Sequence, residues 1–310
     1  MRIHFWGVRG SLPSPVSPAA LRRKLATILA GALPEDLADG ESRERFLSGL
    51  PPWLFGTVGG NTSCVSVELE GFPQGIIFDC GSGMRELGND ADSRKAGYHV
   101  FLSHFHWDHL NGLPFFKPAF DPKVSIDFYS PKPDLERILS NLMLEPYSPV
   151  SMQQTPSTKA FHRMQAPITL GSGEISFRKM PHPGDSFAYK IKSGGKSFLY
   201  ATDVEFGPDD FCRNEENAAF FGNLDLAVID SQYDLLEAER KKGWGHSSYC
   251  IAVEFAAAWG IKHLVLFHCD PSALDSDLYR MAGAAARYAD FLCGRNLKVS
   301  IACEGTDIVL

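Results

Sequence analysis

The stretch Ser103-His104-Phe105-His106-Trp107-Asp108-His109-Leu110-Asn111-Gly112, residues 103–112, holds three histidines and one aspartate within six positions. Imidazole and carboxylate groups are ligands of zinc and related divalent ions. Side chains alternate along an extended segment, so His104 and His106 point to the same side and can bind one ion. If the chain turns after His106, Asp108 and His109 reach a second position nearby. The spacing therefore predicts a metal site with room for two ions.

The residues before this cluster favour that interpretation over a surface run of histidines with a helix-capping aspartate. Residues 98–103 (Tyr-His-Val-Phe-Leu-Ser) are apolar enough to form a strand, which would deliver the cluster to the edge of a sheet. Ligands gather beyond the carboxyl ends of strands in α/β sheets. Three more candidate ligands follow predicted strands in the same way, namely His182, Asp203 and His268.

Another histidine, His246, lies in Gly243-Trp244-Gly245-His246-Ser247-Ser248 at the start of a predicted helix. A serine caps such a helix, and the helix N-terminus favours a nearby anion. His246 is therefore a candidate for contacting a phosphate or protonating a leaving group, and the alternative is that it braces the helix start. The remaining histidines have no partner in sequence and are interpreted as structural: His4, His99, His162 and His263. Cys80 and Cys269 are expected to behave as small apolar residues.

The composition is that of a globular protein, with 310 residues of which 44% are hydrophobic. Apolar stretches are too short to span a membrane, and residues 1–10 lack the pattern of a secretory signal. Seven scattered cysteines favour a reducing compartment, so we expect a cytoplasmic protein without disulfides. The net charge of −7 lacks the overall basic character of a nucleic-acid binder.

The order of predicted elements indicates one domain over residues 1–310. Strands with the character of a β-meander are expected in the first half, and strand–helix alternation in the second, which predicts a layered α/β protein. Residues 14–56 interrupt this pattern as a helical insertion, with one helix over 19–30 and another over 35–50. The insertion is either a lid over the domain or a surface helical hairpin.

These motifs together resemble the metallo-β-lactamase-fold hydrolases, whose αββα sandwich has a dinuclear metal site. The resemblance runs through Asp79 in Phe-Asp-Cys-Gly-Ser-Gly, the 104–109 cluster, His182, Asp203 and His268. It implies that one metal is held by His104, His106 and His182. The resemblance also implies that the second metal is held by Asp108, His109 and His268. It implies that Asp203 bridges the two metals and that Asp79 holds the ligands in position.

Within that family the chain is similar to the phosphodiesterase branch of ribonuclease Z and the phosphonate-pathway cyclic phosphodiesterase. Gly59-Gly60-Asn61-Thr62-Ser63, Asp79-Cys80-Gly81-Ser82-Gly83 and Gly245-His246-Ser247-Ser248 carry this likeness. Where ribonuclease Z has a glutamate that orients the phosphate-binding histidine, this chain has Ser231. Either Asp230 orients His246 in its place, or no residue does. No long basic arm for tRNA is visible, and tRNA is therefore not expected as a substrate.

The resemblance implies a dinuclear metal-dependent hydrolase, a phosphodiesterase of a small nucleotide or cyclic phosphodiester that uses a metal-bridging hydroxide. Asp108 and His246 are the candidate catalytic residues. Two divalent ions are expected, with Zn²⁺ first and Mn²⁺ or Fe as alternatives. A thioesterase or lactonase of the same fold, or a non-catalytic metal-binding scaffold, remains open, as does a homodimer. No membrane partner is expected.

Overall fold

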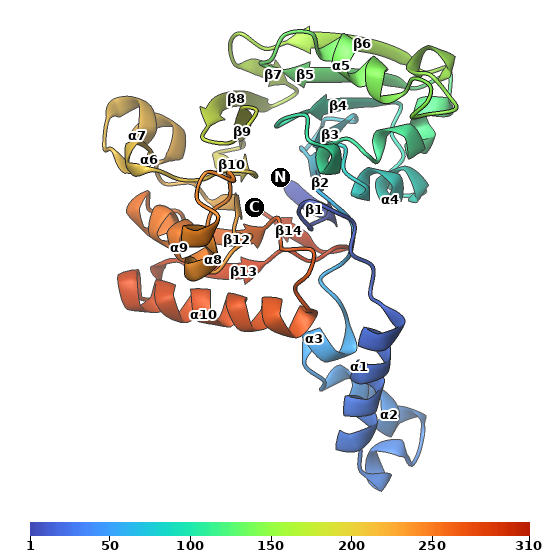
Figure 1. Cartoon of the computed structure of the whole chain (residues 1–310), viewed down its shortest axis with the longest axis vertical. Helices are drawn as coiled ribbons and strands as arrows, with labels where there is room; N and C mark the ends of the chain where they lie inside the picture. Colours follow the sequence, from blue (N-terminus) through green and yellow to red (C-terminus); the bar gives the residue numbers. More distant parts are fainter.

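The computed structural model describes residues 1–310, and its strands form two sheets of seven (Figure 1). The first sheet has the order β14 (Asp307–Val309), β1 (Arg2–Gly7), β2 (Cys64–Glu68), β3 (Gly75–Phe78), β4 (Gly97–Phe101), β5 (Ser125–Ser130) and β6 (Thr158–Arg163). The second has the order β13 (Lys298–Ile301), β12 (His263–Phe267), β11 (Leu226–Asp230), β10 (Lys196–Ala201), β9 (Ser186–Ser193), β8 (Gly173–Met180) and β7 (Ile168–Leu170).

Both sheets combine an antiparallel part with a parallel part. In the first, β14, β1, β2 and β3 pair antiparallel, whereas β3 to β6 pair parallel. In the second, β7 to β10 pair antiparallel and β10 to β13 pair parallel. The expectation of a meander in the first half and alternation in the second is therefore confirmed for β1–β3 and β10–β13 and wrong for β3–β6 and β7–β10. The crossovers of the first sheet run through elements too short to show helical periodicity, such as the seven-residue α4 (Gly83–Asn89).

Three buried clusters separate four layers, which confirms the expected αββα sandwich. One cluster of 22 residues lies between the sheets, where the rings of Phe78 and Tyr200 stack with their centres 5.2 Å apart. The first sheet packs its outer face on α4 and α5 (Leu135–Leu142) through 19 buried residues. The second sheet is covered through 22 buried residues by α7 (Glu215–Phe221), α9 (Tyr249–Ala258) and α10 (Asp275–Cys293). The short helices α6 (Pro208–Phe211) and α8 (Leu235–Arg240) lie in the connecting loops.

A helical arm, defined as residues 18–55, is inserted between β1 and β2 and projects from the sandwich (Figure 1). It contains α1 (Pro18–Gly31), a 3₁₀ turn (Pro34–Leu37), α2 (Gly40–Ser48) and α3 (Pro52–Phe55). The single helix expected over 35–50 is wrong. Asp39 adopts an extended conformation and its side chain accepts a hydrogen bond from Ser42 N, so it caps a new helix instead of continuing the first. Lys24 Nζ, 2.5 Å from Asp275 Oδ2, connects the arm to α10. None of the helices is long and apolar enough to cross a membrane.

One of the structural histidines gives a pH-dependent contribution to stability. His263 on β12 lies with its Nε2 2.7 Å from Ser300 Oγ, and burial together with Lys298 lowers the pKa of His263 to about 4. The unfolded chain has the ordinary pKa of about 6.5, so between these values only the unfolded state binds this proton. We expect the free energy of unfolding to fall as pH decreases from about 6.5 to about 4. In urea titrations at several pH values, His263→Gln should show a shallower fall than the parent, and identical curves would contradict this.

Candidate metal centre

The predicted ligands come from the carboxyl ends of strands in both sheets. The 104–109 segment follows β4, His182 follows β8, Asp203 follows β10 and His268 follows β12. Two of these residues turn sharply, since φ is +52° at Asp203 and +59° at His268. These are left-handed conformations, in which the chain turns just beyond the end of the strand. All seven predicted ligands meet there.

The first group of donors contains His104, His106, His182 and Asp203. His182 Nε2 lies 3.2 Å from His106 Nδ1 and 3.8 Å from Asp203 Oδ1. His104 Nε2 lies 3.7 Å from the same carboxylate oxygen. Three imidazole nitrogens and one carboxylate oxygen thus surround one point, which is a donor set suited to a divalent metal ion.

The second group contains Asp108, His109, Asp203 and His268. His109 Nε2 is 3.2 Å from Asp108 Oδ2 and 3.0 Å from Asp203 Oδ2. His268 Nε2 is 3.2 Å and 3.3 Å from the same two oxygens. Asp203 therefore directs Oδ1 to the first group and Oδ2 to the second, as a bridging carboxylate would.

The protonation and hydrogen bonding of these residues fit metal ions. Burial lowers the pKa of His104, and likewise of His106 and His182, which favours the neutral form of these rings that binds metal ions. Burial also acts to lower the pKa of His109, but the carboxylates of Asp203, Asp108 and Asp79 raise it. Burial alone would raise the pKa of Asp203, but the surrounding imidazoles hold it well below its usual range. The buried Nε2 atoms of His104 and His109 have no hydrogen-bond partner. Buried polar atoms are otherwise almost always paired, so these nitrogens indicate missing partners such as metal ions.

Asp79, at the end of β3, supports the centre from behind. Its Oδ2 accepts from His109 Nδ1 at 2.8 Å and from the Tyr200 hydroxyl at 2.9 Å. Its Oδ1 accepts from Ser103 N, and Ser103 Oγ donates to Oδ2 at 2.7 Å. A carboxylate bound to one imidazole nitrogen fixes the tautomer and turns the other nitrogen toward the ion. Tyr200 was not among the residues singled out in the sequence, because nothing in a buried strand distinguishes a core tyrosine from one that reaches a carboxylate.

His246 stands beside the two donor groups and is held by Asp230, the last residue of β11. The distance from His246 Nδ1 to Asp230 Oδ2 is 2.6 Å. Burial alone would lower the pKa of His246, but Asp230, with smaller contributions from Asp203 and Asp108, raises it to about 9. Ser231 instead donates to backbone carbonyls of β11 and β12 within the sheet. Asp230 therefore occupies the orienting role left open by the serine.

A third donor group, formed by Asp230 and His246 with Asp203 and His268, is less suited to an ion. The direct hydrogen bond between Asp230 and His246 leaves no space for a metal ion between these two side chains. We therefore interpret His246 as a residue that faces the centre without completing it.

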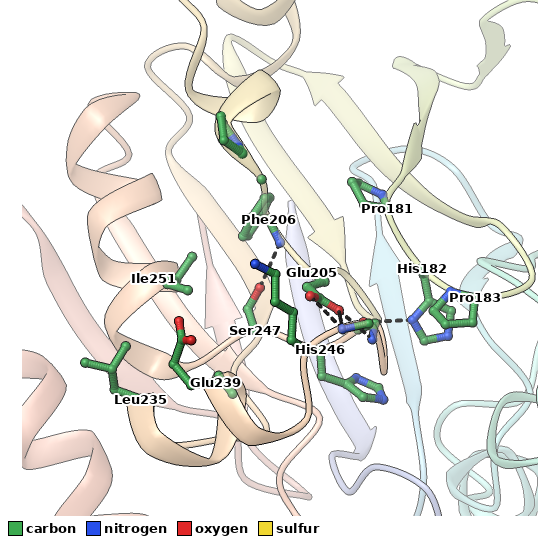
Figure 2. A pocket seen from close by; sticks show the side chains of 16 residues that line it. Pro181, His182, Pro183, Glu205, Phe206, Leu235, Glu239, His246, Ser247 and Ile251 are labelled. Carbon is green, nitrogen blue, oxygen red and sulfur yellow. Dashed lines mark hydrogen bonds between the residues drawn. The ribbon is translucent and has the colours of Figure 1, made fainter.

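The loop before His246 is shaped by Glu205, which sequence reasoning missed (Figure 2). The Glu205 carboxylate accepts from Gly243 N and Gly245 N, all at 2.9 Å. Gly245 O in turn accepts from His182 Nδ1 at 2.7 Å, which turns His182 Nε2 toward the first donor group. A side chain at Gly245 would collide with the His182 ring, and φ of +90° is strained for other residues. The loop thus positions a candidate ligand and His246 at once.

Removing this support should impair the site without dismantling it. We expect Glu205→Ala to lower kcat roughly tenfold or more, the range typical of residues that orient ligands from outside. The loss should be accompanied by weaker metal binding, because His182 loses its fixed orientation. Both quantities can be measured by steady-state kinetics and by competition with a chelator. Glu216→Ala, which removes a surface carboxylate paired with Arg178, is the matched control and should change neither. Equal values for both variants would contradict the role of Glu205.

A cavity of about 510 Å³ lies next to this loop and is bordered by both His182 and His246 (Figure 2). Phe206, Leu235 and Ile251 contribute apolar surface, and Lys242 contributes a cation. The cavity is large enough for part of a small substrate whose reacting group lies at the donor groups.

The four histidines interpreted as structural each have a hydrogen-bond partner away from the centre: His4 with Asp307, His99 with Tyr129 and Gln74, His162 with Asp127, and His263 with Ser300. Cys80 and Cys269 are buried among apolar residues, and burial raises the pKa of both thiols. Neither thiol takes part in the donor groups.

Comparison with known families adds to this geometry. Residues 75–269 match the model of the beta-lactamase superfamily domain, which is more than half of the chain and includes every candidate ligand. The chain belongs to this superfamily. It is a metal-dependent hydrolase of the metallo-β-lactamase fold.

Among curated relatives, the chain is 24% identical to a ribonuclease Z of Synechococcus sp. (strain WH7803), over 72% of this chain and 83% of the relative. Among solved structures, it superposes on human tRNase Z, short form, with a TM-score of 0.62 and 17% identity, covering 100% and 99% of the two chains. It superposes on a diphosphatase of the PhnP family with a TM-score of 0.62 and 15% identity, covering 100% and 97%. The two superpositions show that the fold is shared.

The expectation that tRNA is not a substrate finds no support in these relatives. That expectation rested on the net charge and on the lack of a long basic arm. Net charge describes the whole surface, whereas the field in a cleft with bound divalent ions is set by those ions. The whole-chain charge therefore does not decide which phosphodiester reaches the centre.

Proposed function

We propose that this chain is a phosphodiesterase with two divalent metal ions, and that Zn²⁺ is the metal it uses. The observation that carries the proposal is the hydrogen bond of 2.6 Å that fixes His246 Nδ1 to Asp230 Oδ2 beside both donor groups. An imidazole that a buried carboxylate holds in place can donate from its other nitrogen to a substrate that is anionic where it reacts, such as a phosphodiester. A thioester or lactone is neutral at the corresponding atoms before it reacts, so such a substrate would gain less in binding from this donor.

Each of the two donor groups would hold one ion. His104, His106 and His182 would hold one, Asp108, His109 and His268 the other, and Asp203 would contact both. Bound there, two divalent ions supply Lewis acidity toward phosphoryl oxygens and lower the pKa of a coordinated water. Asp79 keeps His109 oriented by accepting from its Nδ1. Asp108 is held in place by the backbone N–H of Ser11 at 2.8 Å.

His246 supplies the proton for the leaving group in this proposal. Its Nδ1 is bound to Asp230, so Nε2 is the atom available to the substrate. Asp230 stabilises the protonated ring before the reaction, and Nε2 gives its proton to the leaving oxygen as the P–O bond breaks. Because Asp230 is fully buried and hydrogen-bonded to this ring, it also sets the direction in which Nε2 points.

The test is a reconstitution of the metal-free protein with Zn²⁺ or Mn²⁺, followed by a substrate panel. The panel contains bis-p-nitrophenyl phosphate, 2′,3′- and 3′,5′-cyclic nucleotides, a tRNA precursor, a glutathione thioester and a β-lactam. We expect metal-dependent turnover of phosphodiesters, with the preferred member defining the substrate. Turnover of only the thioester or the β-lactam would overturn the proposal. Binding of metal without turnover of any compound would favour the non-catalytic scaffold.

A further inference from the structure

Two exposed tryptophans distinguish the surface around the metal centre. The chain has five tryptophans, and Trp107 and Trp244 are 66% and 64% exposed, whereas the other three are buried or partly buried. Both exposed tryptophans adjoin site residues in the sequence. Trp107 lies between the candidate ligands His106 and Asp108, and Trp244 is two residues before His246. Exposure of this much indole surface at two such positions points to a ligand that covers it.

The two tryptophans belong to loops that meet at the same side of the centre. His182 connects these loops, since its Nε2 is 3.2 Å from His106 Nδ1 and its Nδ1 donates to Gly245 O at 2.7 Å. Trp107 is covalently next to His106, and Trp244 is covalently next to Gly245. Trp107 is exposed between two members of the donor groups, so its indole lies at the rim of the centre.

Further aromatic and cationic groups lie along this rim. The Tyr147 ring is 73% exposed and stands 6.5 Å from the Trp107 ring at an angle of 70°. Lys242 borders the cavity next to His246, and Lys132 Nζ contacts Gly184 O beside His106 and lies 3.8 Å from Asp185 Oδ2. Flat aromatic faces combined with cations are the arrangement with which proteins bind nucleotides, since every base has a π-face and every linkage a negative charge.

We propose that Trp107 and Trp244 bind the bases of a nucleotide phosphodiester by stacking and so place its phosphate at the metal centre. This inference rests on the proposed function and specifies its substrate as a phosphodiester that bears planar bases. Stacking is tolerant of base identity, so the site would accept purine and pyrimidine substrates alike. Trp107 and Trp244 are thus specificity residues that touch the substrate away from the reacting bond.

Binding can be measured without turnover, from the intrinsic fluorescence of the Zn²⁺-loaded protein. Adenosine 5′-monophosphate and ribose 5-phosphate share a phosphate and differ in the base. We expect the nucleotide to quench tryptophan fluorescence in a saturable way and to bind roughly tenfold or more tightly than the sugar phosphate. Trp107→Ala and Trp244→Ala should each reduce nucleotide affinity by a similar factor, whereas Trp107→Phe, which keeps a stacking face, should retain most of it.

The matched control is Phe291→Ala, which removes an aromatic ring that is 83% exposed on α10, outside the donor groups and the cavity. It should leave nucleotide affinity unchanged. Equal affinity for the nucleotide and the sugar phosphate, or unchanged affinity in both alanine variants, would overturn the inference. Turnover of phosphodiesters with unaltered KM in both variants would overturn it while leaving the proposed function intact. Base-dependent binding without turnover of any phosphodiester would support the stacking role of the tryptophans and overturn the proposed function.

Discussion

Asp203→Ala should abolish both hydrolysis and the binding of metal, with a loss of activity of at least about a thousandfold. Asp203 is the residue common to all the donor groups, and its two oxygens face different groups. Without this carboxylate, the first group has only imidazoles, and Asp108 in the second group is the one carboxylate left to balance two cations. Metal content by mass spectrometry of the dialysed protein and hydrolysis of bis-p-nitrophenyl phosphate give the two measurements.

A control with similar chemistry is available at the other end of the first sheet. Asp307 accepts from His4 Nδ1 at 2.7 Å and forms an ion pair with Arg2, away from the centre. Asp307→Ala removes a carboxylate from a histidine in the same way and should leave metal content and hydrolysis unchanged. Retention of two ions by Asp203→Ala would show that the bridging assignment is wrong.

His246→Ala should separate catalysis from metal binding. The ring is bound to Asp230 and lies outside the two donor groups that we assign to the ions. General acid catalysis contributes roughly a hundred- to ten-thousandfold, so we expect kcat to fall within that range while metal content stays at the parent level. Asp230→Asn should give a smaller loss in the same direction, since the ring remains but its charged form loses its partner.

The leaving group provides a sharper measurement of the same role. A substrate with a good leaving group, such as p-nitrophenolate, needs little protonation, whereas an alkoxide leaving group needs much more. The loss in His246→Ala should therefore be larger for a dinucleotide than for bis-p-nitrophenyl phosphate. His162→Ala, which removes a histidine bound to Asp127 on the first sheet, should have no effect on either substrate. Equal losses on both substrates would contradict proton donation and leave only phosphate binding.

The positions of the candidate ligands could be predicted because each follows its strand within a few residues. A strand is recognisable from local composition, and a polar residue just beyond its end lies at the edge of the sheet. His182, Asp203 and His268 illustrate this. The residues that orient them could not be predicted in this way. Glu205 reaches Gly243 and Gly245 across 38 to 40 residues of chain, and that contact depends on how two loops pack in space.

Whether Asp230 or no residue orients His246 shows the same limit at the scale of one residue. Adjacent side chains of a strand face opposite sides, so Asp230 and Ser231 could not both face His246, but the sequence did not say whether Asp230 does. The direction in which the strand ends is decided by its register with β12, where Asp230 pairs with Phe267. The single helix predicted over 35–50 was wrong for a local reason, because Asp39, followed by Gly40, caps a new helix instead of continuing the first.

The backbone of the centre contains several strained conformations. Seven non-glycine residues have positive φ, and four of them surround the metal site: Ser11, Asp79, Asp203 and His268. Each such conformation costs about 1 kcal/mol or more, and glycine would relieve it. Glycine at Asp203 or His268 would therefore relieve backbone strain while removing a side chain of the donor groups. At these two positions the stability of the fold and the binding of metal ions oppose each other.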